Sequence, residues 1–430
     1  MRVELAYGRN GLSLELPDER TVVIAPRHVP GLSDEKAAVV EALERPIEAA
    51  PLRSWLRPDT RLCITFSDVT RATPNDRLIP WLLEQLRELP ASSITLINQV
   101  GTHRPNTQAE LERLLTPAVV RHYRVLNHEP ENPEALVTVG TLRDGTPALI
   151  NRHVVEADVR IVTGFIEPHF FAGYSGGVKG IAPGCAGLRT IQSNHGPCHI
   201  AHPKATFGQT EGNPLWEELR DVALRAGPSF LLNVTLNERR QITGVFAGDL
   251  VAAHRAGAAF VRASAMQEVD RPFEVVVTTN SGYPLDLNLY QGVKGLSAAA
   301  RIVRPGGLIL LACECSEGVP AASPFERLLC RAASPEALLA MMQEPGFSEP
   351  EQWQAQILAQ IQQHARVQVH STLPRSVLEA CHLEPCADLA DAVARELSRH
   401  GPGARVAVLP HGPLTIPVLR CADAPGADMR

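Results

Sequence analysis

The chain has 430 residues, of which 44% are hydrophobic and 20% charged, a composition typical of a globular protein with ample apolar material for a core. This length predicts two or three domains. The net charge of −6 and the lack of a basic run argue against a nucleic-acid-binding protein, and no apolar stretch is long enough to cross a membrane. A soluble cytoplasmic protein with no nucleic-acid or membrane partner is therefore expected.

The first residues, MRVELAYGRNGLSLELP, predict two short strands and not a signal peptide, since they lack the apolar region of a secretory signal. The 9 cysteines are scattered and form no CxxC pair. Cys313 and Cys315 stand in the apolar stretch GLILLACEC, where alternate strand residues face the same way. We expect mostly reduced, buried cysteines and no cysteine-rich zinc site.

Short apolar, β-branched segments recur along the chain, and most are followed by a polar or glycine-containing turn and then by a helical pattern. The predicted strands cover 62–66, 93–100, 157–165, 273–280, 307–315 and 404–412. The predicted helices cover 76–89, 107–115, 250–266, 296–303 and 324–333. Repeated strand, loop and helix predict an α/β protein with mainly parallel sheets.

A domain boundary is expected near 268–272, between a predicted helix and a new strand. We assign residues 1–268, together with about 403–430, to a larger N-terminal α/β domain, to which the strand at 404–412 would return. Residues 272–400 would form a smaller C-terminal α/β domain. The active site is expected in the cleft between these two domains.

Chemically versatile side chains follow the predicted strands at the points where the strands end. Asp68 and Arg71 follow the strand at 62–66, whereas His103 and His169 follow the next two predicted strands. The segment 290–294 comes after the strand at 273–280. Because ligands of parallel α/β sheets bind at the carboxyl ends of strands, we expect these residues to form one composite site.

Two of these residues, His103 and His169, are a candidate acid–base pair. His103 stands beside a glycine in GTHR, and His169 follows GFIEP. Two imidazoles on opposite sides of a substrate suit chemistry in which either hand of a molecule loses or gains a proton. A single histidine is more often structural or simply exposed, so that alternative stays open.

Arg71, in DVTRATP, is a candidate anchor for a carboxylate, which its planar guanidinium can bind through two N–H groups. It could equally be a surface arginine paired with Asp68 or Asp76. Asp68, for its part, could orient Arg71 or hold a ribose hydroxyl.

The segment LYQGVKG adds Tyr290, Gln291 and Lys294. At helical spacing, Tyr290 and Lys294 would share one face. The alternative is that this segment is the first turn of an ordinary helix.

The glycine-rich stretch EPHFFAGYSGGVKGIAPGCAG, residues 167–187, is not a nucleotide-binding P-loop, because Val178 separates Gly177 from Lys179. Its glycines could simply serve tight turns with positive φ. A lysine among glycines and near histidines is a candidate for covalent attachment of a cofactor, although most lysines are merely exposed. His195, in SNHGPCH, could bind a metal, but one histidine does not make a metal site by itself.

Taken in order, the stretches DVTRATP, GTHR, EPHFFAGYSGGVKGIAPGCAG, NHG and YQGVKG resemble the nickel-dependent lactate racemase family. The matching stretches run from Asp68 to Lys294, and the flanks are compatible with similarity over the full length. The long central motif is highly specific.

The resemblance implies a nickel-pincer nucleotide, a cofactor of the pyridinium-3,5-bisthiocarboxylic acid mononucleotide type that is supplied by cofactor-biosynthesis enzymes. It holds nickel through two sulfurs and one ring carbon in a planar geometry that suits this metal. Lys179 would carry the cofactor covalently, and His195 would complete the nickel coordination. The other cofactor contacts implied are Asp68, Val69, Thr70, Arg71, Gly176 and Gly177.

For the substrate, the resemblance implies that His103 and His169 are the general acid/bases. The residues implied to bind substrate are Arg71, Tyr290, Gln291 and Lys294. Trp353 matches a pocket tryptophan of the family only loosely, and its role is left open. The N-terminal domain would bind the cofactor, and the C-terminal domain would close over it.

The implied reaction is racemisation of a small 2-hydroxy acid such as lactate by hydride shuttling through a planar 2-keto acid. The same residues would suit another 2-hydroxy acid such as malate, or C2 epimerisation of a sugar acid, because they grip only the shared carboxylate and hydroxyl. A non-catalytic nickel or cofactor carrier would not need two facing histidines. A Schiff-base enzyme that uses pyridoxal phosphate would need Lys179 but no nickel.

Overall fold

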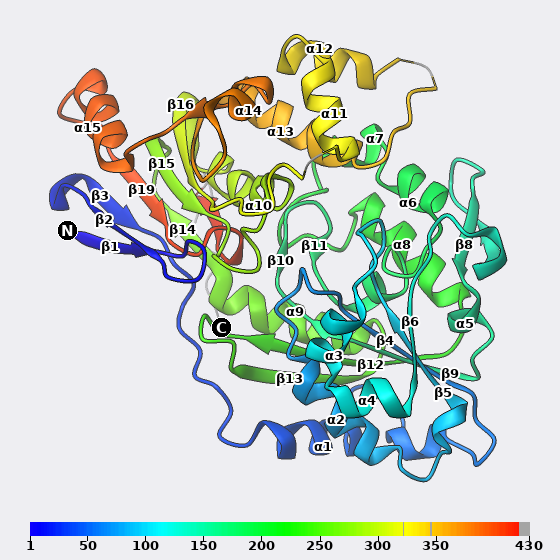
Figure 1. Ribbon diagram of the computed structural model, residues 1–430. Helices are drawn as coiled ribbons and strands as arrows, with labels where there is room; N and C mark the ends of the chain where they lie inside the picture. The colour runs from blue at the N-terminus through cyan, green and yellow to red at the C-terminus, as the bar shows by residue number, and fades with distance from the viewer. Residues whose placement is uncertain (321, 345, 421–430) are drawn as a thin grey trace. The chain divides into compact units, whose positions relative to one another are not determined.

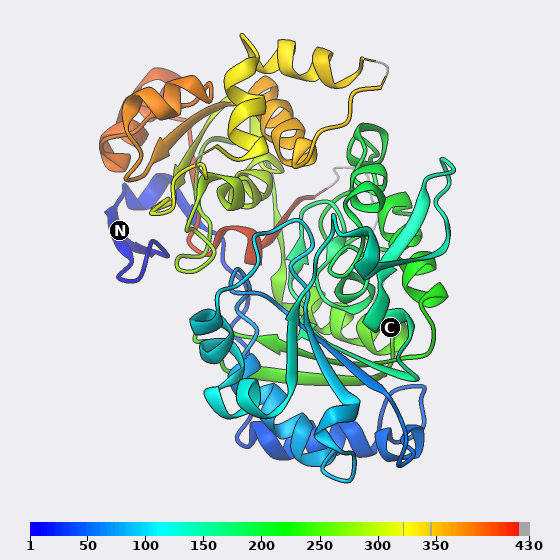
Figure 2. The same cartoon turned by 45° about the vertical axis from the view of Figure 1, so that its right-hand side comes forward.

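The computed structural model describes residues 1–320, 322–344 and 346–420, which form two compact units (Figures 1 and 2). The central unit comprises His28–Ala263 together with 346–353. The terminal unit comprises Met1–Arg27, Ser264–Glu344 and the described residues from Gln354 onward. Each unit is built on its own six-stranded, mainly parallel sheet with helices, so the predicted α/β class with two domains is confirmed.

The sheet of the central unit has the strand order β13-β12-β9-β4-β5-β6. Its strands are β4 (Leu62–Phe66), β5 (Ile94–Asn98), β6 (Arg124–Asn127), β9 (Val159–Phe165), β12 (Ser229–Leu236) and β13 (Ile242–Asp249). All neighbours run parallel except β12 and β13, which are antiparallel. The predicted strands at 62–66, 93–100 and 157–165 therefore lie side by side, with their carboxyl ends at one edge.

The two faces of this sheet have different roles. Leu62, Ile64 and Phe66 point into an apolar core that also receives the buried side chains of four helices. These helices are α1 (Glu35–Glu44), α2 (Asn75–Gln85), α3 (Gln108–Leu115) and α4 (Pro117–His122). Thr65, on the opposite face by strand alternation, accepts a hydrogen bond from Gln99 Nε2, beside the glycine-rich loop. The glycine-rich loop therefore lies on the face away from helices α1–α4.

The remaining elements of the central unit surround that loop or extend from it. They are β7 (Leu136–Thr141), β8 (Pro147–Asn151), α5 (Arg152–Val155), β10 (Pro168–His169), β11 (Gly173–Tyr174), the 3-10 turn η5 (Gly177–Gly180), α6 (Leu188–Asn194), α7 (Pro197–Ile200), α8 (Pro214–Arg225) and most of α9 (Ala252–Ala265). β10 and β11 form a minimal hairpin in which His169 pairs with Gly173.

The sheet of the terminal unit has the order β18-β17-β16-β15-β19-β3, and all of its neighbours run parallel. Its strands are β3 (Thr21–Val23), β15 (Phe273–Thr279), β16 (Val303–Ala312), β17 (Arg366–His370), β18 (Glu384–Pro385) and β19 (Val406–Leu409). The antiparallel hairpin of β1 (Arg2–Leu5) and β2 (Leu12–Glu15), with helix α15 (Leu389–His400), contributes buried side chains to the core on one face.

Helix α10 (Leu289–Ala300) packs closely on the other face of this sheet. A Cβ at Gly292 would approach Cys313 Sγ within 3.2 Å, and one at Gly295 would come within 2.1 Å of the backbone oxygen of Thr279. Two glycines therefore let the helix approach strands β15 and β16. Further helices of this part of the chain are α11 (Pro324–Arg331), α12 (Pro335–Met342), α13 (Gln352–His364) and α14 (Arg375–Ala380).

The predicted domain division needs two corrections. Residues 1–27 belong to the terminal unit and not to the N-terminal domain, and so does the strand expected at 404–412, observed as β19. β19 is buried at all four positions and lies between β15 and β3. Helix α15, which precedes β19, packs on β15, and a strand that follows such a helix returns in parallel to the same sheet.

Two predicted elements also differ from those observed. The segment 268–272, where a domain boundary is expected, overlaps β14 (Met266–Val269), which pairs with β20 (Ile416–Leu419). Helix α10 begins at Leu289, earlier than the predicted helix at 296–303, so the segment 290–294 is its first part. The alternative interpretation of LYQGVKG as the start of an ordinary helix is thus correct for its secondary structure.

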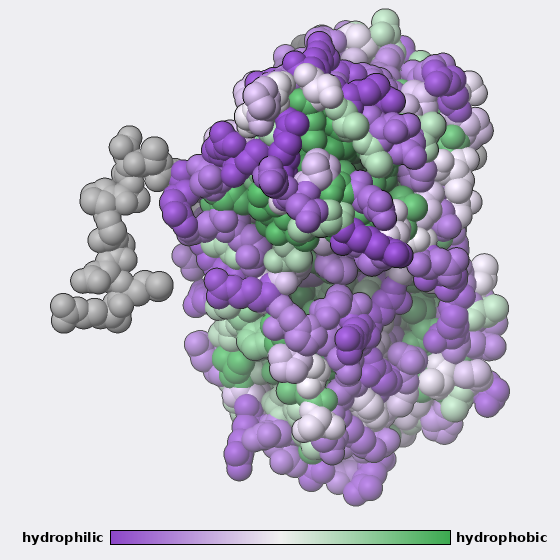
Figure 3. Space-filling view, turned by 90° about the vertical axis from the view of Figure 1, so that its left-hand side faces the viewer, coloured by the Kyte–Doolittle hydropathy of each residue, from purple (hydrophilic) through white to green (hydrophobic). Residues whose placement is uncertain are grey.

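The face in Figure 3 is covered mainly by hydrophilic residues with smaller apolar areas between them. No helix among the described residues is both long and apolar enough to cross a membrane. The described cysteines are free thiols, mostly buried, as predicted.

Candidate active site

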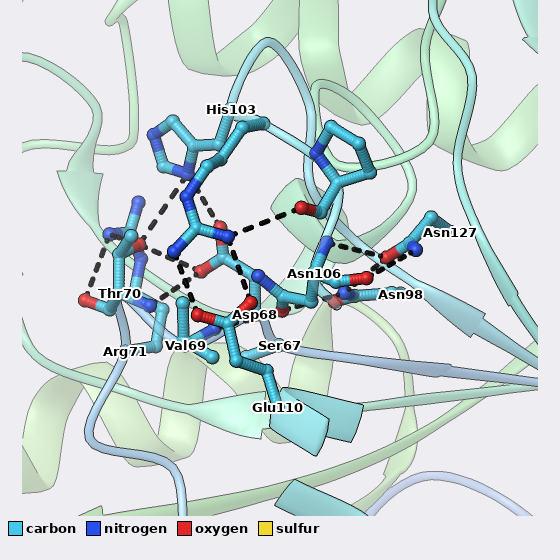
Figure 4. Close-up of polar contacts among 12 residues, drawn as sticks. Ser67, Asp68, Val69, Thr70, Arg71, Asn98, His103, Asn106, Glu110 and Asn127 are labelled. Carbon is cyan, nitrogen blue, oxygen red and sulfur yellow. Dashed lines mark hydrogen bonds and ion pairs between the residues drawn. The ribbon is translucent and has the colours of Figure 1, made fainter. Parts of the chain in front are cut away.

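The loop after β4 forms a hydrogen-bonded network with the turn after β5 (Figure 4). Asp68 Oδ2 lies 2.7 Å from His103 Nδ1, and Asp68 Oδ1 accepts a hydrogen bond of 2.7 Å from Thr70 Oγ1. The Thr70 hydroxyl oxygen accepts a hydrogen bond of 2.9 Å from the Arg71 guanidinium. The structure thus brings Asp68, Thr70, Arg71 and His103 together by direct contact, with Asp68 oriented toward His103.

Asp68 is 2% exposed, so its charge has to be stabilised inside the protein. Burial alone would favour the protonated acid, but the charge and hydrogen bond of His103, the charge of Arg71 and the hydrogen bond of Thr70 outweigh it. Together they lower the pKa of the Asp68 carboxyl to about 2. Asp68 is therefore a carboxylate that stabilises positive charge on His103.

Buried amides fix the position of this network. Asn106 Oδ1 accepts hydrogen bonds from the backbone N–H of Val69 and from Asn98 Nδ2, at 3.2 Å and 2.9 Å. Asn127 is hydrogen-bonded to both the backbone and the side chains of this group (Figure 4). The turn that carries His103 is also held to the glycine-rich loop, because Gly101 N–H donates to the backbone oxygen of Gly184 at 3.0 Å.

His169 lies at the end of β10 and is 8% exposed. Its Nδ1 accepts a hydrogen bond of 3.2 Å from the backbone N–H of Ala172. Its ring stacks on Phe170 at 4.9 Å between centroids and meets the edge of Phe171 at 4.5 Å. Two aromatic rings and a backbone amide thus fix the orientation of the imidazole.

Phe171 brings together the residues that the sequence predicted for the cofactor. Its ring lies 5.1 Å from that of His195 and 5.4 Å from Lys179 Nζ, as well as 4.5 Å from His169. The ring of Trp353 lies 5.0 Å from that of His195 on a further side. His169, Lys179 and His195 are therefore gathered around Phe171, a role that the sequence did not assign to this residue, and Trp353 lies against His195.

Lys179 stands in η5 with its amino group poorly solvated. Burial, with a smaller contribution from the positive charge of Arg71, lowers the pKa of this amine to about 7. A lysine with such a pKa is largely a neutral nucleophile just above neutral pH. The charge of Arg71 lowers the pKa of both Lys179 and Asp68, so Lys179 is coupled electrostatically to the network around Asp68.

His195 caps the carboxyl end of α6 and is 3% exposed. Burial, with help from the charge of Lys179, holds the pKa of this imidazole well below its usual value, so the ring is neutral. Its Nδ1 is buried and has no hydrogen-bond partner among the described residues. A buried neutral imidazole with an unsatisfied nitrogen has the electronic state of a metal ligand.

The glycines before Lys179 pack against two buried polar side chains that were not predicted from the sequence as part of the site. Asn233, on β12, accepts a hydrogen bond of 2.8 Å from Gly177 N–H, and His254, on α9, lies 2.8 Å from the backbone oxygen of Ser175. A Cβ at Gly176 would come within 2.3 Å of Asn233 Oδ1, and one at Gly177 within 2.5 Å of the His254 ring. Both glycines have positive φ, as the tight-turn interpretation requires. Asn233 could have been noticed as a polar residue inside the apolar stretch FLLNVTL.

Tyr290, Gln291 and Lys294 lie in the first turns of α10 in the terminal unit. Asn288 caps this helix by accepting a hydrogen bond of 3.0 Å from Gln291 N–H. Gln291 is 4% exposed, and its Oε1 has no hydrogen-bond partner among the described residues. Tyr290 meets the ring of Phe325 at 5.4 Å, and its backbone oxygen accepts a hydrogen bond from Gln354. An unsatisfied buried carbonyl near a helix N-terminus is a candidate binding feature.

Comparison with known proteins identifies the family. Residues 7–208 match the model of the lactate racemase N-terminal domain, and residues 269–417 match that of the lactate racemase C-terminal domain. The chain is 34% identical to the lactate racemase of Thermoanaerobacterium thermosaccharolyticum over 418 residues, which is 95% of this chain and 97% of that protein. The chain belongs to the lactate racemase family. It is therefore an isomerase of the racemase type, as predicted.

Other relatives agree with this membership. The lactate racemase of Lactiplantibacillus plantarum is 33% identical over 95% of this chain and 98% of its own length. The lactate racemase apoprotein from T. thermosaccharolyticum superimposes with a TM-score of 0.90 at 32% identity, over 98% of this chain and 100% of that chain. A protein from Thermotoga maritima shares the fold, with a TM-score of 0.68 at 18% identity over 91% of this chain and 100% of that chain.

Proposed function

We propose that this member of the lactate racemase family racemises a small 2-hydroxy acid, with lactate as the first candidate, by hydride shuttling through the 2-keto acid. The observation that carries the proposal is the cluster around Phe171, where a lysine with a pKa of about 7 lies beside two buried histidines. A structural cluster has no need for a neutral lysine, whereas covalent attachment of a cofactor requires one. The two lactate racemases that are 34% and 33% identical to this chain support lactate as the substrate.

The residues present fit a nickel-pincer nucleotide. The described residues include no group of three or more His, Cys, Asp or Glu side chains that could hold a metal ion, so these residues alone do not supply a complete metal site. His195 nevertheless offers one buried nitrogen without a partner. A metal here would need its other ligands from a bound group, and that is the arrangement of a pincer cofactor.

In this proposal Lys179 holds the cofactor covalently, and His195 provides the protein ligand to nickel. The bound cofactor would supply the acceptor for the hydrogen at C2 of the substrate. The DVTR segment, Asp68 to Arg71, contacts the cofactor, and the positive φ of Gly176 and Gly177 shapes the loop that presents Lys179. The rings of Phe171 and Trp353 pack against His195 in edge-on contacts and help to exclude water from it.

The substrate is held by its carboxylate and its hydroxyl. The Arg71 guanidinium suits the carboxylate, and His103 and His169 handle the hydroxyl proton. The proposal requires that Tyr290, Gln291 and Lys294 reach the same substrate. These groups recognise only what all 2-hydroxy acids share, so malate and C2-epimerised sugar acids remain second candidates. We place the reaction in the cytoplasm, a reducing compartment that suits the free cysteines.

The test is a racemisation screen with protein produced alongside the cofactor-biosynthesis enzymes. Pure enantiomers of lactate, malate and other 2-hydroxy acids are incubated with the loaded protein, and chiral chromatography follows the second enantiomer. We expect lactate to approach a racemic mixture from both sides. If malate is racemised and lactate is not, malate would replace lactate as the proposed substrate. Protein that binds nickel and cofactor but converts no 2-hydroxy or sugar acid would favour the carrier interpretation.

A further inference from the structure

The position of the ring hydrogen on His103 follows from its neighbours. The Thr70 hydroxyl donates its one hydrogen to Asp68 Oδ1, and its oxygen lies 3.4 Å from His103 Nδ1. His103 Nδ1 also lies 2.7 Å from Asp68 Oδ2, which can only accept when ionised. Figure 4 shows these contacts of His103. Since both atoms are acceptors there, we infer that the hydrogen is on Nδ1 and the lone pair of the neutral ring is on Nε2.

His169 has the opposite arrangement. The backbone N–H of Ala172 donates to His169 Nδ1, so the lone pair of this ring is on Nδ1. In a neutral imidazole the hydrogen must then be on Nε2. A backbone amide, unlike the Asp68 carboxylate, gives no stabilisation to a second proton on the ring. Phe170 and Phe171 hold the ring in this orientation.

We propose that the two histidines are inequivalent: His103 is the base that takes the hydroxyl proton, whereas His169 rests as an Nε2–H donor to the substrate oxygen. The inference rests on the proposed function and deepens it. In the proton transfer, the O–H bond of the substrate breaks and an N–H bond forms at His103 Nε2. The resulting imidazolium is held by the Asp68 carboxylate, which acts as a positioning residue. If a bound cofactor accepts the C2 hydrogen together with its electron pair, the electron pair of the O–H bond would become the second bond of the keto group.

The inequivalence has a kinetic consequence. Before His169 can take a proton, its hydrogen must move to Nδ1, which costs the hydrogen bond from Ala172. The enantiomer that presents its hydroxyl to His103 should therefore react faster in the first half-reaction. Because enantiomers have equal free energies, kcat/KM of the two directions stays equal, and the difference appears only in single-turnover rates.

The ring hydrogens can be located in the apoprotein without any cofactor. Long-range ¹H–¹⁵N spectra of protein labelled with ¹⁵N-histidine distinguish the two neutral tautomers, and His103→Gln and His169→Gln assign the signals. We expect His103 protonated on Nδ1 and His169 on Nε2. Asp68→Asn should move the His103 hydrogen to Nε2, whereas the exposed control Asp76→Asn should not. Equal tautomers in the two rings of the wild-type protein would overturn the inference, whether or not the protein proves to be a racemase.

Single-turnover kinetics of loaded enzyme test the same inference by function. His169→Gln places an amide N–H near the position of Nε2, and His169→Asn places one near Nδ1. We expect the Gln variant to keep the rate for the faster enantiomer within about tenfold and the Asn variant to lose about a hundredfold. His103→Gln should lose at least about a hundredfold with both enantiomers. Equal losses in the two His169 variants for both enantiomers would show that His169 is a base of equal standing.

Discussion

Among single residues, Lys179 has a pKa far from that of an ordinary lysine. A lysine in water titrates near pH 10.4, whereas burial and Arg71 lower the pKa of Lys179 to about 7. Its neutral, nucleophilic form should thus appear as the pH rises through about 7. Pulse acetylation of the apoprotein between pH 5 and 10, read by peptide mass spectrometry, should show half-maximal labelling of Lys179 near that pH. A curve that coincides with that of a free lysine peptide would refute the environment described for this amine.

His195 should determine how much nickel the loaded protein binds, but not whether the cofactor is attached to Lys179. Its unsatisfied Nδ1 is absent from the His195→Ala variant, whereas Lys179 is unchanged there. We expect loaded His195→Ala to lose most of its nickel by metal analysis but to keep the covalent mass increase at Lys179. His202→Ala, at an exposed histidine of the same segment, is the matched control and should keep both. Full nickel content in His195→Ala would place the protein ligand elsewhere.

Among the elements, the glycine-rich loop depends on the packing beneath it. Gly176→Ala has to adopt a positive φ and also places its Cβ within 2.3 Å of Asn233 Oδ1. Gly145→Ala, with φ of +87° and no atom within 4 Å, shares the backbone cost without the contact. We expect Gly176→Ala to lower the free energy of unfolding by about 1–3 kcal/mol more than Gly145→Ala, the usual cost of overpacking. If urea titrations show equal losses of unfolding free energy in the two variants, the loop accommodates the added Cβ without further destabilisation.

The strands and the polar residues that follow them could be predicted because the sequence patterns that indicate them are short and local. The strand at 62–66 is bounded as predicted, and Asp68 and His103 follow strands that are indeed neighbours. The contacts below the loop could not be predicted. Asn233 and His254 come from β12 and α9, far along the chain, and only tertiary packing brings them to Gly176 and Gly177.

For the whole molecule, the α/β fold class could be predicted from the sequence, but the sheet to which each strand belongs could not. The apolar strand 406–409 could complete either parallel sheet by its sequence alone, and its place between β15 and β3 depends on the packing of α15. The position of residues 1–27 is likewise decided by β3 pairing with β19. Residues 421–430, which the predicted division placed in the N-terminal domain, lie outside the described residues.

This sheet order makes a prediction about truncation. A chain that ends at residue 403 lacks β19, so β15 and β3 lose their shared neighbour, while the central unit keeps all of its strands. We expect limited proteolysis to degrade the terminal unit of the truncated chain and to leave a fragment near 28–263. Equal protection of the two units would contradict the observed strand order.

Hydride shuttling requires that the C2 hydrogen leaves the substrate and returns to it without exchange with water. L-lactate deuterated at C2 is incubated in ordinary water with protein loaded with cofactor. The D-lactate formed is collected by chiral chromatography, and its deuterium content is measured by mass spectrometry. We expect the D-lactate to keep the deuterium. D-lactate with hydrogen from the solvent at C2 would show a proton-abstraction mechanism and contradict hydride shuttling. No D-lactate at all from fully loaded protein would contradict lactate as the substrate.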